Sequence, residues 1–167
     1  MSADGLLLLV GASRYNENNG NDDAGAVIFF YRRVSVGETW TLQDRLDLYQ
    51  PGNNKVAYPY SLALSGDNSR VVIGCPRYVA STFGINGDSA DPSQSLPAQT
   101  GMVFVAEFDH VLENWSVHST INIEGTSFPS SPFTYFGESV DISQDGLTIA
   151  VGAPGFKSLN SHRWHQP

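Results

Sequence analysis

The sequence contains a single cysteine, Cys75, so no disulfide within the chain can hold it together. Only 16% of the residues are charged, and 17 acidic residues outnumber 9 Lys and Arg, which gives a net charge of −8. An acidic surface repels nucleic-acid phosphates and anionic lipid headgroups. We therefore expect neither nucleic acid nor an anionic membrane surface as a partner.

Long hydrophobic runs are also missing. The longest cover residues 6–10 and 26–31, whereas a helix needs about 20 apolar residues to cross a bilayer. The first run is too short for the apolar part of a signal peptide, and no basic residues precede it. We expect neither direct membrane insertion nor a signal peptide or transmembrane segment in these residues.

Glycine and proline are frequent, with 16 and 9 residues, which suits short strands joined by turns. Residues 136–155, FGESVDISQDGLTIAVGAPG, have the pattern of a complete β-hairpin. Val140 and Ile142 alternate with polar residues, as in a half-buried strand. The turn at 143–146 ends in Gly146, which can adopt a positive φ. Three apolar residues at 149–151 then predict a second strand covered on both faces.

This hairpin occurs more than once. Residues 2–13, 65–76 and 143–154 align without gaps, at offsets of 63 and 78 residues. The strand before the turn also recurs, because residues 58–64 match 136–142, while the first copy begins at the turn. Self-similarity at this spacing is typical of repeat architectures.

Each of the first two hairpins is followed by a polar loop and two further strands, the second of which starts at Trp40 or Trp115. The units cover about residues 1–57, 58–133 and 134–155, and residues 156–167 do not follow the repeat. Four antiparallel strands per repeat are typical of a β-propeller blade. The sequence therefore predicts an all-β fold, an incomplete propeller of two to three four-stranded blades.

The pattern FG-x-S-V-x-x-S-x-D-G-x-x-x-A-V-GAP, followed in the other units by Gly-x-Val-x-Val and Trp, resembles the FG-GAP repeat of integrin α-subunit propellers. The second unit departs from it at Tyr58–Pro59, which replaces Phe-Gly. The resemblance implies a non-catalytic module, at the cell surface or outside the cell, that presents loops to a protein or glycan partner. It also implies further repeats or self-association, because propellers close as rings of about four to eight blades.

Two other interpretations stay open. The chain could be a fragment of a propeller enzyme, polysaccharide-active or hydrolytic, with catalytic residues outside these 167 residues. It could also be an incomplete gene product without independent activity. No Ser-His-Asp set, catalytic carboxylate pair or phosphate loop stands out, and a fold alone does not supply a chemistry.

Calcium is the one cofactor that the resemblance suggests. The family loop Asp-x-Asn-x-Asp-Gly-x-x-Asp is incomplete here, because Asp141, Ser143 and Asp145 keep its first half but Ile149 replaces the last acid. Ca²⁺ requires six or more oxygen ligands, so a plain turn is favoured. A second candidate is a loop whose composition equally suits a solvated connection; its oxygen-bearing residues are Asn16, Asn18, Asn21, Asp22 and Asp23.

Three other residues receive structural interpretations. Cys75 takes the place of a small residue at the end of a buried strand, and nothing near it in sequence would lower its pKa, so we expect a buried thiol. Trp40 and Trp115 recur at the same point of their units. We therefore expect both tryptophans to pack between units.

Overall fold

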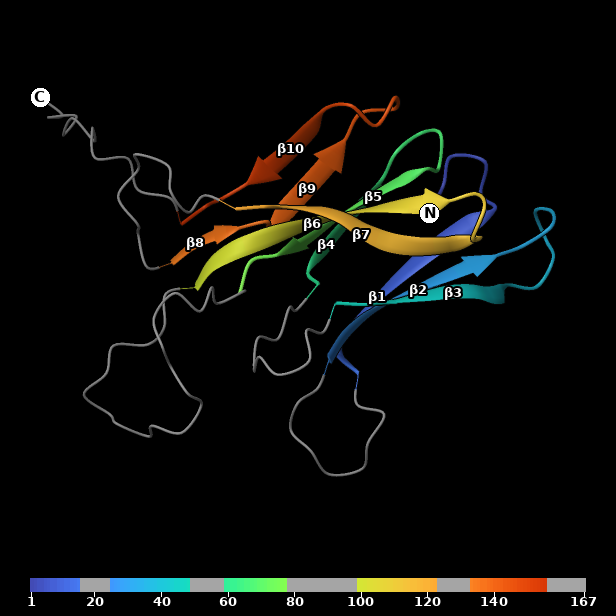
Figure 1. Cartoon of the computed structure of the whole chain (residues 1–167), viewed down its shortest axis with the longest axis horizontal. Helices are drawn as coiled ribbons and strands as arrows, with labels where there is room; N and C mark the ends of the chain where they lie inside the picture. Colours follow the sequence, from blue (N-terminus) through green and yellow to red (C-terminus); the bar gives the residue numbers. More distant parts are fainter. Residues whose placement is uncertain (16–24, 49–58, 78–98, 123–132, 156–167) are drawn as a thin grey trace, which may run out of the picture.

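A computed structural model describes residues 1–15, 25–48, 59–77, 99–122 and 133–155 (Figure 1). These residues form ten β-strands, and no helix occurs among them. The predicted all-β class is thus confirmed. In the same part of the chain, no helical segment has the length and apolarity to cross a membrane.

The strands form two antiparallel sheets and a separate hairpin. The N-terminal sheet has the order β1 (Leu7–Tyr15), β2 (Gly25–Arg32), β3 (Thr41–Asp47). The central sheet has the order β4 (Ser61–Leu64), β5 (Arg70–Cys75), β6 (Gln99–Asp109), β7 (Asn114–Ile121). The C-terminal hairpin pairs β9 (Ser139–Ile142) with β10 (Ile149–Gly152). In each case consecutive strands are neighbours, as the sequence predicted.

One strand was not predicted. β8 (Phe133–Phe136) pairs in parallel with β6, which places it at the edge of the central sheet. The sequence suggested one continuous strand from Phe136 to Ile142. Instead the chain bends between β8 and β9, where Tyr135 and Gly137 have φ values of +53° and +92°. Gly137 adopts this conformation without the strain that a side chain would add.

The two sheets repeat each other in register. Leu8 pairs with Tyr31 in the first sheet and Val71 pairs with Ala106 in the second. These pairs correspond at offsets of 63 and 75 residues, and Trp40 and Trp115 are also separated by 75. Both sheets contain a β-bulge at the same place, after Phe30 in one and after Val105 in the other. The repetition therefore extends to individual backbone pairs.

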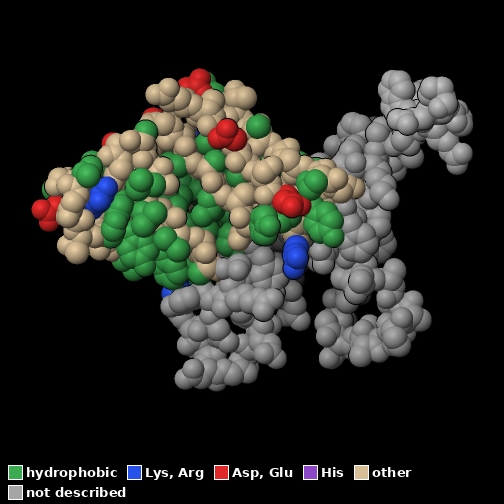
Figure 2. All heavy atoms as spheres, turned by 180° about the vertical axis from the view of Figure 1, so that it is seen from behind, with side chains coloured by type: hydrophobic (Ala, Val, Ile, Leu, Met, Phe, Trp, Pro, Cys, Tyr) green, Lys and Arg blue, Asp and Glu red, His purple; other side chains and the backbone are tan. Residues whose placement is uncertain are grey.

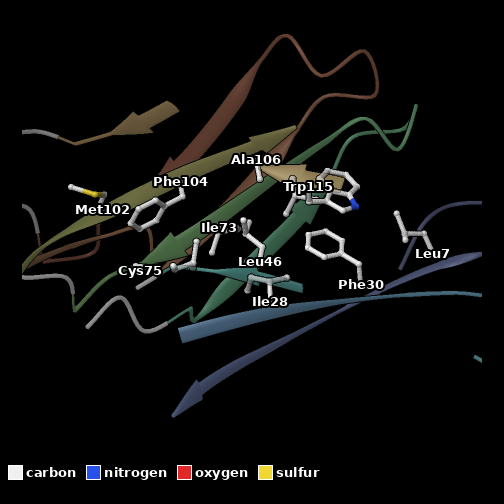
Figure 3. Packing of buried hydrophobic residues seen from close by; sticks show 12 residues of the cluster. Leu7, Ile28, Phe30, Leu46, Ile73, Cys75, Met102, Phe104, Ala106 and Trp115 are labelled. Atoms are coloured by element: carbon white, nitrogen blue, oxygen red, sulfur yellow. The ribbon is translucent and has the colours of Figure 1, made fainter. Parts of the chain in front are cut away.

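The central sheet is covered on both faces. Val71 and Ile73 on one face contact the N-terminal sheet, in a cluster with Ile28, Phe30 and Trp115 (Figure 3). Val72 on the other face packs with Ile142 of the C-terminal hairpin. Because side chains alternate along a strand, an apolar run on β5 can supply both faces. The molecule therefore has three stacked layers.

The layers all stack in the same sense. Leu9 and Val72, which are equivalent, each face the layer that follows in sequence. Ile149 and Val151, equivalent to Val71 and Ile73, face back toward the central sheet. The remaining residue of this run, Ala150, is exposed, so the prediction that this strand is covered on both faces was wrong. Only the side of β10 that contacts the central sheet is covered.

Candidate binding surface

The strand order separates long connections from short turns. We call the end of the sheets that contains the end of β1, the start of β2 and the ends of β3, β5 and β7 the connection end. These strands lead into residues 16–24, 49–58, 78–98 and 123–132, which lie outside the described residues. The opposite end, the turn end, carries the short turns between strands (Figure 1). Connections of variable length at one end of a rigid scaffold are where binding residues commonly lie.

The turn end is built from one motif that occurs three times. In the central sheet, Ser65 Oγ donates to Asp67 Oδ1 at 2.6 Å and accepts from the backbone N–H of Arg70 at 3.0 Å. The same two bonds join Ser2 with Asp4 and Leu7, and Ser143 with Asp145 and Thr148; their lengths are 2.6, 2.8, 2.6 and 2.9 Å. The recurring Ser-x-Asp sequence thus closes each hairpin by the same hydrogen bonds.

These bonds stabilise the ionised aspartates. The Ser65 hydroxyl, followed by the backbone N–H and the hydroxyl of Ser69, lowers the pKa of Asp67 from 3.8 to about 2. The pKa values of Asp4 and Asp145 are lowered too, first by the hydroxyls of Ser2 and Ser143. Hydrogen bonds to a carboxylate favour its charged form. These carboxylates therefore act in the turns as acceptors.

The lowered pKa predicts how the fold responds to acid. Asp67 has a lower pKa in the folded chain than the ordinary 3.8, so its contribution is present above that value and is lost as the pH falls toward about 2. We expect Asp67→Asn to lower stability at pH 5 and to flatten its decline between about pH 4 and 2. Urea unfolding across this range measures the effect. Parallel curves for the two proteins would contradict it.

An open hollow lies at the connection end, beside the contact between the central sheet and the C-terminal hairpin. It measures about 520 Å³ and is lined by Tyr60, Glu138, Ser139, Gly152, Ala153 and Pro154. Tyr60 is 70% exposed, and it is held by its backbone N–H, which donates to Gly74 O at 2.8 Å. Tyr60 and Glu138 occupy equivalent positions, 78 residues apart. Sequence reasoning did not select them, although an aromatic residue just before a short strand was visible.

The two predicted calcium sites have different outcomes. The residues of the first, Asn16, Asn18, Asn21, Asp22 and Asp23, lie outside the described residues. In the second, Asp145 Oδ1 accepts from Ser143 and from the Leu147 N–H, and Asp141 Oδ1 accepts from the Ile142 N–H at 2.9 Å. Across the described ranges, no group of three or more His, Cys, Asp or Glu side chains is arranged to hold a metal ion.

Calcium dependence can be tested directly. A ligand that binds only the folded chain raises its thermal midpoint by mass action. We expect little or no shift on adding calcium at about 1–5 mM, a range that would occupy even a weak site. A clear rise that disappears in the double variant Asp22→Ala/Asp23→Ala would contradict this and would establish the loop as a calcium site.

The remaining predicted residues have structural roles. Cys75 is fully buried, and burial raises the pKa of its thiol to about 12, which makes it a poor nucleophile. Trp115 packs between the sheets, stacked on Phe30 at 4.5 Å. Trp40 is half-buried, and the Arg33 guanidinium lies 4.5 Å from its ring centroid. The expectation of packing between units is thus confirmed for Trp115, whereas Trp40 contacts a residue of its own sheet.

No protein-family model matches the chain, and a search of curated proteins finds no significant similarity.

Proposed function

We propose that this chain is a segment of a β-propeller of FG-GAP repeats that acts without catalysis and binds a protein or glycan through its connection end. The observation that carries the proposal is the stacking of three register-matched units in one sense. Such stacking is what successive propeller blades require, because each blade covers one face of the next. By the same resemblance, we place the module at the cell surface or outside the cell.

The spacing of the family motif fits this stacking. Gly74, in the Gly-Cys-Pro that replaces Gly-Ala-Pro, lies against Gly137 of the Phe-Gly in the next unit. At the equivalent place one unit earlier, Gly11 lies 3.5 Å from Pro59, which replaces that glycine. The two ends of the motif therefore meet across the contact between units. This gives the glycines a physical reason and supports the proposed repeat family.

Among the two partner classes, the hollow at the connection end favours a glycan. It is open and shallow, and it places the exposed aromatic ring of Tyr60 near the carboxylate of Glu138. An aromatic face offers apolar contact area at low entropic cost, and a carboxylate accepts hydrogen bonds from hydroxyl groups. A sugar presents both apolar C–H faces and hydroxyls, so these two residues match its chemistry.

The purified 1–167 chain should be applied to a printed glycan array and to a panel of extracellular matrix proteins. We expect saturable binding to at least one glycan, weakened about tenfold or more by Tyr60→Ala, because an exposed aromatic anchor carries much of the binding energy at such a site. Leu112→Ala is the matched control, since Leu112 is 69% exposed but lies at the turn end.

The same preparation distinguishes the alternatives. Release of reducing ends from any polysaccharide on the array would support the enzyme interpretation. Binding that Leu112→Ala weakens as much as Tyr60→Ala would place the site elsewhere. Absence of binding to every glycan and every protein would contradict the proposal and favour an incomplete gene product.

A further inference from the structure

The N-terminal sheet has an apolar face that no described residue of another layer covers. On its inner face, Leu9, Ile28 and Phe30 contact the central sheet. Alternation places the neighbours of these residues on the opposite, outer face: Leu8, Val10, Phe29, Tyr31, Trp40 and Leu42. Figure 2 shows hydrophobic side chains gathered over this sheet, on the side turned away from the viewer in Figure 1.

The repeat shows that this face has the chemistry of a packing surface. Leu8 and Val10 are equivalent to Val71 and Ile73, and Phe29 is equivalent to Phe104. In the central sheet these equivalents are 7% exposed or less, because the N-terminal sheet covers them. On the outer face, Val10 is 42% and Leu42 is 55% exposed. What covers this surface one unit later is the apolar face of another three-stranded sheet.

We propose that the occupant of this outer face is the same face of a second copy of the chain, which forms a twofold symmetric dimer. The opposite end of the stack cannot supply an apolar surface, since the outward side of β9 and β10 carries Ser139, Asp141 and Ala150. A head-to-tail contact would therefore place this polar surface on an apolar one. Face-to-face pairing instead places two apolar sheets together, as in sheet-on-sheet packing.

The charges on the face are self-complementary. Alternation places Arg33, Arg45 and Asp47 on it. Arg45 Nη2 lies 2.8 Å from Asp47 Oδ1, while the Arg33 guanidinium covers Trp40. A twofold axis that runs across the strands brings β3 antiparallel over its copy, so that Arg45 faces Asp47 of the partner subunit. The chain as a whole carries −8, so this balanced face is where two copies repel each other least.

The size of the face sets the expected affinity. Three strands about 4.8 Å apart, with about seven residues of about 3.3 Å each, have a flat footprint on the order of 300 Å² per copy. This lies near the lower limit for specific protein–protein contacts. We therefore expect a reversible dimer with Kd on the order of 10 μM. The inference depends only on the chemistry of this face and does not require the proposed glycan binding.

Sedimentation velocity of the 1–167 chain from about 1 to 200 μM tests the dimer across the expected Kd. We expect a monomer–dimer equilibrium that Leu42→Glu weakens about tenfold or more, because each substitution acts twice in a twofold interface. Val117→Glu is the matched control: Val117 is equivalent to Leu42 and 40% exposed, but lies in the central sheet. It should leave the equilibrium unchanged.

A charge exchange separates an interface effect from a folding effect. Asp47→Lys places like charges across the axis and should weaken the dimer, whereas the double exchange Arg45→Asp/Asp47→Arg should restore it. A chain that stays monomeric at every concentration overturns the proposal, and so does a dimer that neither Leu42→Glu nor Asp47→Lys weakens. A growing series of oligomers also overturns it, in favour of head-to-tail assembly.

Discussion

Replacing Trp115 with alanine should lower the free energy of unfolding by about 3–5 kcal/mol, the range for removing a large aromatic side chain from a core. The indole is 5% exposed and stacks on Phe30, with an angle of 10° between the rings. Phe108 contacts its ring at 5.4 Å. Trp115 thus joins two strands of its own sheet and the sheet in front. Because domains are stable by only about 5–15 kcal/mol, this change should remove a large part of the total.

Trp40→Ala provides the matched comparison. Trp40 occupies the equivalent position, 75 residues earlier, but its ring is half-buried and covered by Arg33. An exposed cation–aromatic contact contributes about 0.5–1 kcal/mol, so we expect a loss of about 1 kcal/mol. Urea unfolding at low protein concentration measures both variants. Equal losses would mean that Trp115 owes its stability contribution to its own sheet and not to the contact between sheets.

A Trp115→Phe variant adds a second check. Among the described residues, no acceptor meets the indole Nε1. Phenylalanine therefore removes a polar atom without a partner and keeps the stacked ring, and we expect most of the stability to return. The backbone N–H of Trp115 also donates to Asp44 Oδ2 of the N-terminal sheet at 2.6 Å. This hydrogen bond is available to either side chain, so the comparison isolates the ring.

Much of this arrangement could be predicted from the sequence, because the strands are short and local. The apolar run at 71–73 and the turn that ends in Gly146 determine a hairpin from neighbouring residues alone. Gly146 has φ +71°, as that turn requires. The repeat then extended the pattern to the other units. The burial of Cys75 followed from the same logic, since its equivalents, Ala12 and Ala153, are small.

What the sequence did not reveal depends on contacts between distant residues. β8 exists because Gln99 and Gly101 of β6 pair with Phe133 and Phe136, which no local pattern encodes. The exposure of Ala150 depends on what lies beyond β10. The hollow at Tyr60 and Glu138 forms only where two units meet. Asp145 was considered a calcium ligand because its turn hydrogen bonds are not visible in the sequence.

The contact between the central sheet and the C-terminal hairpin should tolerate no side chain at Gly74. A Cβ built there would lie less than 3 Å from the carbonyl oxygen of Gly137 and from Ser61 Oγ. Ser61 Oγ itself donates to that carbonyl at 2.9 Å, so the hairpin is held by the same atoms that alanine would displace. We expect Gly74→Ala to lower the free energy of unfolding by about 2–3 kcal/mol, as overpacking does.

The equivalent change one unit earlier should be tolerated. A Cβ at Gly11 would meet Pro59 and Leu62 side-chain atoms at 3.5 Å, which is ordinary van der Waals contact. Gly11→Ala should therefore change stability by less than about 0.5 kcal/mol, or raise it slightly by restricting the unfolded chain. Urea unfolding gives both values, and hydrogen exchange at Val140 and Ile142 reports whether Gly74→Ala loosens the hairpin. If both alanines cost the same, the close glycine contact would not be what joins the hairpin to the central sheet.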